Sequence, residues 1–138
     1  MKTSILLVDD EPSFLESTAE LLRNDGHRCD TAEDAHRADE LLASQWYDLL
    51  ISDIRMNGNK NLEFIERAQL MRPGLPIILV TGYPSTETAI SSIHLPVVAY
   101  LRKPLQYGEL QEHVRRALTQ SEAFRTVAQA QERLRQIA

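Results

Sequence analysis

The chain contains a single cysteine, Cys29. Without a second thiol an intramolecular disulfide is impossible, and a cysteine-based metal site is not expected. Because the residues around Cys29 form a strand-like stretch over 27–32, we interpret the thiol as a small core residue. This use of cysteine fits a reducing compartment, so we expect a cytoplasmic location.

Long apolar runs and a positive net charge are absent as well. No apolar stretch approaches the length that spans a bilayer, and residues 1–4 lead straight into a strand-like segment instead of resembling a secretory signal. The formal net charge of -5 argues against direct nucleic-acid binding. Neither a helix-turn-helix pattern nor a nucleotide-binding loop of the Gly-x-x-x-x-Gly-Lys type occurs.

Four nearly continuous apolar runs are present instead, at residues 5–8, 49–52, 77–80 and 97–101. Such runs are typical of strands that are buried on both faces of a parallel sheet. A weaker strand is expected near residues 28–31. Apolar residues at helical spacing separate the strands and predict five helices.

The expected helices have recognisable ends. Pro12 suits the first position of a helix that ends at Asp25-Gly26. Thr31 and Asp34 resemble a weak capping box before a second helix, whose apolar face includes Trp46. The third, fourth and fifth helices are expected near residues 62–71, 86–93 and 110–118, and residues 56–61 are expected to form a loop. The alternation predicts an α/β fold, a doubly wound five-stranded parallel sheet with helices on both faces.

Polar residues follow four of the apolar runs. Asp9 and Asp10 follow the first, Asp53 the run at 49–52, Thr81 the run at 77–80, and Lys103 the run at 97–101. The carboxyl ends of parallel strands meet at one edge of the sheet, where ligands bind in open α/β folds. We therefore expect three carboxylates, one hydroxyl and one ammonium to converge.

Three crowded carboxylates favour either protonation of one of them or entry of a cation. Hard oxygen ligands without His or Cys suit Mg²⁺, which is often held by carboxylates together with phosphate oxygens. Thr81 and Lys103 could stabilise the charge on a transferring phosphoryl group. Asp53 is the best candidate for a carboxylate nucleophile that forms an acyl phosphate, because it follows the central-looking strand. Each residue alone has an ordinary explanation as a cap, a turn or a strand end, and the combination carries the prediction.

Over residues 3–119 the sequence resembles the receiver domain of two-component response regulators. The resemblance lies in Leu7-Val8-Asp9-Asp10-Glu11-Pro12, Ser52-Asp53-Ile54-Arg55-Met56, Val80-Thr81-Gly82 and Tyr100-Leu101-Arg102-Lys103-Pro104. It implies a flavodoxin-like sheet with strand order 2-1-3-4-5.

The resemblance also implies a role for each matching residue. Asp53 would be the phosphoacceptor, and Mg²⁺ would bind Asp10 and Asp53 directly, Asp9 through water, and the backbone carbonyl of Arg55. Thr81 and Lys103 would contact the phosphoryl oxygens. Tyr100 would act with Thr81 as an aromatic switch, and the Lys103-Pro104 peptide bond would be cis.

The implied function is phosphorelay signalling. A sensor histidine kinase or phosphotransfer protein would donate the phosphoryl group to Asp53. The domain would catalyse only its own phosphorylation and dephosphorylation. The face formed by the fourth helix, the fifth strand and the fifth helix would then control a homodimer or an output domain beyond residue 138. The resemblance is strongest to receivers attached to transcriptional regulators, and no contact with a membrane or nucleic acid is expected.

One motif departs from the family pattern. Members commonly have Met-Pro-Gly-Met-Asp-Gly after the phosphoacceptor, whereas this chain has Met56-Asn57-Gly58-Asn59-Lys60-Asn61. The change suggests a loop of different shape, with an effect on Mg²⁺ affinity or kinase docking.

Two other functions compete with signalling. A Mg²⁺-dependent aspartyl phosphatase acting on small phosphoesters would also use an aspartyl nucleophile, but such enzymes usually place a second acid two residues later, where this chain has Arg55. An interaction module that has lost phosphorylation would not be expected to keep all five residues of the site.

The end of the chain has a composition of its own. We divide the chain into a receiver domain, residues 1–119, and a C-terminal helical extension or linker, residues 120–138. Residues 121–138 include neither proline nor glycine. A narrow apolar stripe is formed by Phe124, Val127, Ala130 or Gln131, Leu134 and Ile137. The stripe indicates either a protruding helix that packs against another chain or a following domain, or a frayed tail with incidental spacing.

Overall fold

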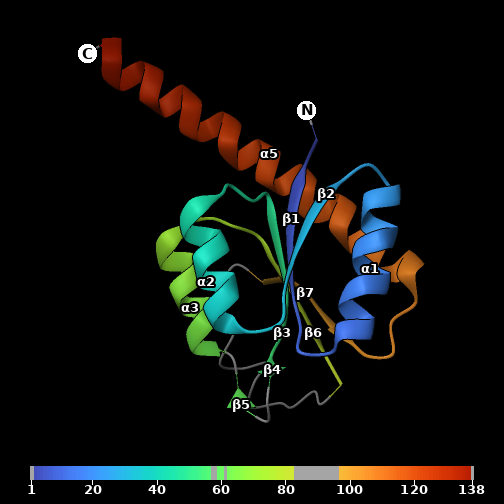
Figure 1. The fold of residues 1–138 in the computed structure, drawn as a ribbon. Helices are drawn as coiled ribbons and strands as arrows, with labels where there is room; N and C mark the ends of the chain where they lie inside the picture. The colour runs from blue at the N-terminus through green and yellow to red at the C-terminus, as the bar shows by residue number, and fades with distance from the viewer. Residues whose placement is uncertain (1, 57–58, 61, 83–96, 138) are drawn as a thin grey trace.

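Five parallel strands form the central sheet of the protein (Figure 1). The computed structural model describes residues 2–56, 59–60, 62–82 and 97–137. The strand order is β2-β1-β3-β6-β7, which is 2-1-3-4-5 when the strands of this sheet are numbered along the chain, as the resemblance implied. The strands are β1 (Ser4–Val8), β2 (Arg28–Ala32), β3 (Leu49–Asp53), β6 (Ile77–Thr81) and β7 (Val97–Arg102).

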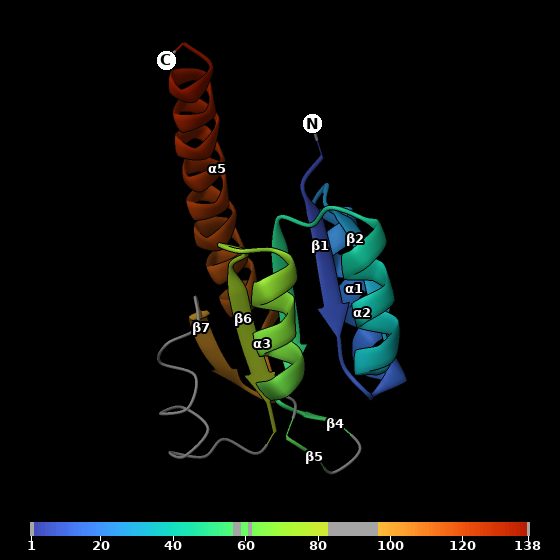
Figure 2. The same ribbon diagram turned by 90° about the vertical axis from the view of Figure 1, so that its left-hand side faces the viewer.

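In the described part of the chain, two helices cover each face of the sheet. Helices α1 (Pro12–Asn24) and α5 (Tyr107–Ile137) lie on one face, and α2 (Ala35–Ser44) and α3 (Leu62–Met71) lie on the other (Figures 1 and 2). Side chains of β1 alternate between two buried clusters: Ile5 and Leu7 pack with α1 and α5, whereas Leu6 and Val8 pack with α2 and α3. This alternation explains why the run is apolar at every position, as expected for a strand that is buried on both faces.

Helix α1 begins at Pro12, as predicted, and Gly26 with a φ of 95° lies in the turn that follows it. A positive φ is accessible to glycine without a steric penalty. The chain then enters β2, where Cys29 is buried in the core between the sheet and α1. Burial raises the pKa of the Cys29 thiol to about 11, so the thiol is an unreactive core group at neutral pH.

The start of α2 differs from the prediction. Its N-cap is Asp34, whose side chain accepts a hydrogen bond from the Arg37 backbone N–H at 2.8 Å, so the capping box that began at Thr31 is wrong. Trp46 was assigned to the apolar face of this helix, but the helix ends at Ser44 and the Trp46 side chain is exposed. The buried aromatic residue here is Tyr47, whose hydroxyl donates to the Asp30 carboxylate at 2.6 Å.

The segment after β3 is more regular than the predicted loop over 56–61. Strands β4 (Arg55–Met56) and β5 (Asn59–Lys60) pair antiparallel, with Arg55 opposite Lys60. The loop prediction is therefore wrong for these residues. Residues 57–58 and 61 lie outside the described residues, as do residues 83–96, which include the fourth helix predicted at 86–93.

Helix α5 continues well past the end of the sheet (Figures 1 and 2). Its first turns are tied to the end of α1, because the Tyr107 hydroxyl and the Gln111 side-chain amide both donate to the Asp25 carboxylate. Farther along, Val127, Leu134 and Ile137 are exposed. Among the described residues, no helix is long and apolar enough to cross a membrane.

We predict that Asp34→Ala lowers the free energy of unfolding by about 1 kcal/mol, because the variant loses the oxygen that caps α2. Urea unfolding followed by circular dichroism measures this change. Asp34→Asn, which keeps a capping oxygen, is the matched control and should match the wild type. Equal stability of the Ala variant and the wild type would contradict the assignment of the cap.

Candidate functional site

Sheet register brings four strand ends to one edge of the molecule. Val8 of β1 is opposite Ser52 of β3, and Thr81, the last residue of β6, is opposite Arg102, the last residue of β7. Asp9 and Lys103 therefore begin the loops that leave β1 and β7, while Asp53 and Thr81 end β3 and β6. The carboxyl edge of the sheet thus carries all the polar residues that the sequence placed at strand ends.

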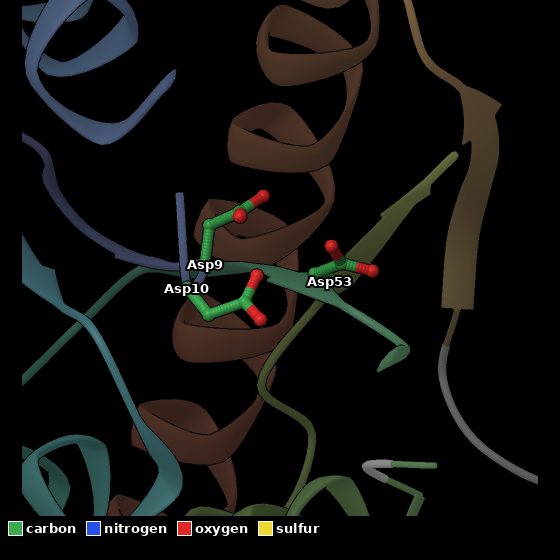
Figure 3. A group of neighbouring side chains, drawn as sticks. All are labelled: Asp9, Asp10 and Asp53. Atoms are coloured by element: carbon green, nitrogen blue, oxygen red, sulfur yellow. The ribbon is translucent and has the colours of Figure 1, made fainter. Parts of the chain in front are cut away.

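The three aspartates form a compact acidic cluster (Figure 3). Carboxylate oxygens of Asp9, Asp10 and Asp53 all lie within 4.8 Å of one another. Asp9 is fully buried, Asp53 is 5% exposed, and Asp10 is partly buried. Burial raises the pKa of Asp9, although hydrogen bonds from Lys103 and from the Glu11 backbone N–H and the charge of Lys103 oppose that rise.

The Lys103 ammonium bridges the carboxylates. Nζ lies 2.6 Å from Asp9 Oδ2, 3.1 Å from Glu11 Oε1 and 3.3 Å from Asp53 Oδ2. Burial by itself lowers the pKa of Lys103, but the hydrogen bond to Asp9 and the charges of Asp9 and Asp53 outweigh it, so the pKa is raised. Lys103 therefore stays charged at neutral pH.

The Asp9 pKa rises in spite of this ion pair because the cost of burying its carboxylate exceeds the stabilisation from Lys103 and the Glu11 backbone, and the nearby charge of Asp53 adds to the rise. One ammonium faces the carboxylates of Asp9, Asp10 and Asp53, with Glu11 at the rim. A single cation shared among several acids leaves the burial cost of the Asp9 carboxylate only partly offset.

The donor set suits a hard divalent cation. Three carboxylates offer one oxygen each within the cluster, and neither His nor Cys takes part in it. Mg²⁺ prefers such oxygens, and its two charges would offset the excess negative charge of the pocket. The residues present therefore fit Mg²⁺ on chemical grounds.

Thr81 and Tyr100 lie on neighbouring strands beside this pocket. Thr81 is fully buried, and its backbone carbonyl accepts a hydrogen bond from the Lys103 N–H at 2.9 Å. Tyr100 is opposite Leu79, two residues before Thr81, so Tyr100 and Thr81 face the same side of the sheet. The Tyr100 hydroxyl is buried and has no hydrogen-bond partner among the described residues.

One other feature that the resemblance implied is observed at this edge of the sheet. The Lys103-Pro104 peptide bond is cis, as the resemblance implied. Arg55, whose backbone carbonyl was named as a metal ligand, begins β4 two residues after Asp53.

Sequence reasoning missed two contacts of Lys103. Glu11 forms the ion pair described above, and the Phe14 ring lies beneath Nζ, 4.4 Å from it at the ring centroid. Glu11 could have been suspected because it directly follows Asp9 and Asp10. Phe14 lies at an apolar position of the first helix, and the spacing of apolar residues in that helix gives no indication of a contact with Lys103.

The fold and the pocket define a doubly wound α/β protein with a carboxylate cluster at the carboxyl edge of its sheet. The sequence profile of the response regulator receiver domain matches residues 5–115. The chain therefore belongs to the response regulator receiver domain family.

Similarity to known sequences and structures supports this family assignment. The transcriptional regulatory protein ZraR of Escherichia coli K12 is 30% identical over 87% of this chain, and the C4-dicarboxylate transport transcriptional regulatory protein DctD of Pseudomonas aeruginosa is 31% identical over 85%. The crystal structure of a CheY-like receiver domain protein from Methanospirillum hungatei superposes with a TM-score of 0.85 and 30% identity, and the match covers 89% of this chain and 98% of that one. The chain spans only 27% of ZraR and 25% of DctD.

We predict that Lys103→Met lowers the free energy of unfolding by about 3 kcal/mol in EDTA, because the buried acids lose their ammonium partner. The same variant should bind Mg²⁺ more tightly than the wild type, since a repelling charge has been removed. Urea unfolding and Mg²⁺ titration calorimetry measure the two effects.

Arg102→Met is the control, because Arg102 is the exposed basic residue next to Lys103. It should leave both quantities nearly unchanged. A Lys103→Met variant as stable as the wild type would show that Lys103 does not offset the charge of the cluster.

Proposed function

We propose that this receiver domain accepts a phosphoryl group on Asp53 in a Mg²⁺-dependent reaction and thereby switches a signalling surface. The observation that carries the proposal is the position of Asp53. Asp53 is the last residue of the central strand β3, and its carboxylate lies beside those of Asp9 and Asp10. Lys103 Nζ lies 3.3 Å from Asp53 Oδ2.

In the proposed reaction, an Asp53 carboxylate oxygen attacks phosphorus, and a P–O bond forms to the side chain. The bond between phosphorus and the donor atom breaks, and the leaving group departs with its electron pair. Lys103 and the Thr81 hydroxyl would bind the oxygens of the transferring group. Mg²⁺ held by Asp10, Asp53 and the Arg55 carbonyl, with Asp9 acting through water, would supply positive charge that stabilises the phosphoryl oxygens.

The switch would couple this chemistry to β7. Drawing the Thr81 hydroxyl toward the phosphoryl group changes the space on the face of the sheet that Thr81 shares with Tyr100. The Tyr100 hydroxyl is buried without a partner among the described residues, and a movement of the ring that gives the hydroxyl a partner would be favourable. The proposed signalling surface comprises β7, the first turns of α5 and the predicted helix at 86–93.

No contact between described residues specifically favours the phosphatase alternative. Asp53 is nearly buried, and Lys103 occupies its Oδ2 side. A phosphoacceptor that turns over slowly fits this geometry better than an enzyme that must admit varied phosphoesters. We therefore propose signalling, with self-catalysed phosphorylation and dephosphorylation as the only chemistry of the domain.

We predict that incubation with acetyl phosphate and Mg²⁺ adds one phosphoryl group to the wild type and none to Asp53→Asn. Intact-mass spectrometry measures the addition, and omission of Mg²⁺ or addition of EDTA should abolish it. Asp34→Asn is the matched control, since it makes the same chemical change at an exposed helix cap. Modification of Asp53→Asn, or steady release of phosphate from many phosphoesters, would contradict the proposal.

The proposed donor is a sensor histidine kinase or phosphotransfer protein, and the proposed setting is the cytoplasm. Curated relatives of this chain are transcriptional regulatory proteins much longer than it. We therefore propose that the domain controls an output domain, and that its signal reaches that domain through α5.

We also propose that the exposed stripe of α5 pairs with a second copy of the chain. Val127 and Leu134 are seven residues apart, as equivalent core positions of a coiled coil are. Ile137 follows three residues later, which is the spacing between one core position and the next.

We predict that Leu134→Asp raises the dissociation constant of the dimer at least about tenfold, because a carboxylate would be buried where the stripes of the two α5 helices pack together. Sedimentation equilibrium before and after phosphorylation measures the constant. Gln136→Asp, an acidic substitution at an exposed position outside the stripe, is the control. Equal effects of the two variants would exclude the stripe as the contact.

A further inference from the structure

The Lys103 ammonium has an aromatic neighbour as well as its carboxylates. Nζ lies over the Phe14 ring, 4.4 Å from the ring centroid. A cation within about 6 Å of a ring centroid is attracted to the negative face of the aromatic ring. Phe14 belongs to the first turn of α1, and Lys103 follows β7, so the pair joins two elements that border the acidic pocket.

We propose that Phe14 is a positioning residue for phosphoryl transfer: its ring holds the Lys103 ammonium at the pocket by a cation–π interaction. This inference rests on the proposed phosphorylation of Asp53. It adds to that function a residue that bears no charge and lies outside the acidic cluster.

One of the carboxylates that contact Lys103, that of Asp53, changes during the reaction, whereas the 2.6 Å contact with Asp9 does not involve the reacting group. When an Asp53 oxygen forms its bond to phosphorus, the donor's bond to phosphorus breaks and the leaving group takes the electron pair. The Asp53 carboxylate then becomes an acyl phosphate, and the 3.3 Å contact with Lys103 Nζ loses its original partner. The Phe14 ring keeps its quadrupole throughout, so its attraction for the ammonium does not depend on the state of Asp53.

The Phe14 ring is a more durable contact for the Lys103 ammonium than the Glu11 carboxylate is. The Glu11 side chain is 60% exposed, so water and salt weaken its attraction for Lys103. The Lys103 side chain is only 12% exposed, and cation–π attraction is stronger where the cation is shielded from water. Phe14 is itself partly buried and packs against the core beneath α1, which fixes the ring.

A purely space-filling role for Phe14 predicts different behaviour from a cation–π role. Leu at position 14 keeps an apolar side chain but has no quadrupole, whereas Tyr keeps the ring. Phe64→Leu makes the same chemical change in the opposite core cluster and serves as the control for lost packing.

The experiment measures the rate of phosphorylation by acetyl phosphate in the full chain. Phe14→Leu should slow the reaction roughly 3- to 30-fold, which is the range that a cation–π interaction of ordinary strength supports. Phe14→Tyr should stay within about twofold of the wild type. In a Lys103→Met background, Phe14→Leu should cause no further loss, because the partner of the ring is already gone.

A second readout tests the contact without phosphorylation. The chain has three lysines, Lys2, Lys60 and Lys103, so lysine labelled with ¹³C at Cε gives a spectrum that is easily assigned. The ring should shift the Lys103 ε protons upfield in the wild type and in Phe14→Tyr. That shift should disappear in Phe14→Leu and persist in Phe64→Leu.

The outcomes separate the two proposals. A slow Phe14→Leu variant that Tyr rescues, with loss of the upfield shift, supports the positioning role. A Tyr variant as slow as the Leu variant, an additive effect in the Lys103→Met background, or an unshifted Lys103 signal in the wild type overturns it. If wild-type protein takes up no phosphoryl group while the Lys103 shift is present, the proposed function fails and with it the role in transfer, although the contact itself stands.

Discussion

Three carboxylates and one ammonium share a pocket at the carboxyl edge of the sheet, and their charges do not balance. Ionising all three carboxylates at once is unfavourable because Asp9, Asp10 and Asp53 lie so close together, and Lys103 offsets only part of their repulsion. Burial raises the pKa of Asp9 even though a lysine contacts it. The pocket therefore has an electrostatic preference for additional positive charge, and this preference underlies the fit to Mg²⁺. In the proposed reaction it is the bound cation, together with Lys103, that would attract the negatively charged oxygens of the transferring phosphoryl group.

The rest of the fold keeps this unfavourable cluster together. Strands β1, β3 and β6 are buried between helices on both faces, and the two core clusters they form fix the register of the strand ends. Apolar burial of this extent outweighs the repulsion of a few acids. The same packing supports Phe14 and Lys103, so the positions of the ammonium and the ring follow from the core rather than from flexible surface loops.

The site is also connected to parts of the chain that carry no acid. The Lys103 backbone N–H donates a hydrogen bond to the Thr81 carbonyl, and Lys103 lies shortly before α5. Helix α5 is in turn held to the end of α1, because Tyr107 and Gln111 donate hydrogen bonds to the Asp25 carboxylate. Tyr100, on the strand that leads to Lys103, carries a buried hydroxyl without a partner among the described residues. These features lie along one path from the pocket to the long helix, which is the route we propose for the signal.

Much of the architecture could be inferred from residue order because burial on both faces demands continuous apolar strands, and parallel strands place their carboxyl ends together. That reasoning predicted the sheet and brought Asp9, Asp10, Asp53, Thr81 and Lys103 to one edge. It failed where the outcome depends on how side chains point. The N-cap of α2 is Asp34, where Thr31 had been predicted to begin a capping box. Trp46, predicted on an apolar helix face, is exposed, and its neighbour Tyr47 is buried. An antiparallel pair of short strands is found where a loop had been predicted. The contact of Phe14 with Lys103 joins residues far apart in the chain, and no local periodicity encodes it. It arises only when α1 packs on the sheet and the loop after β7 brings Lys103 to the start of that helix.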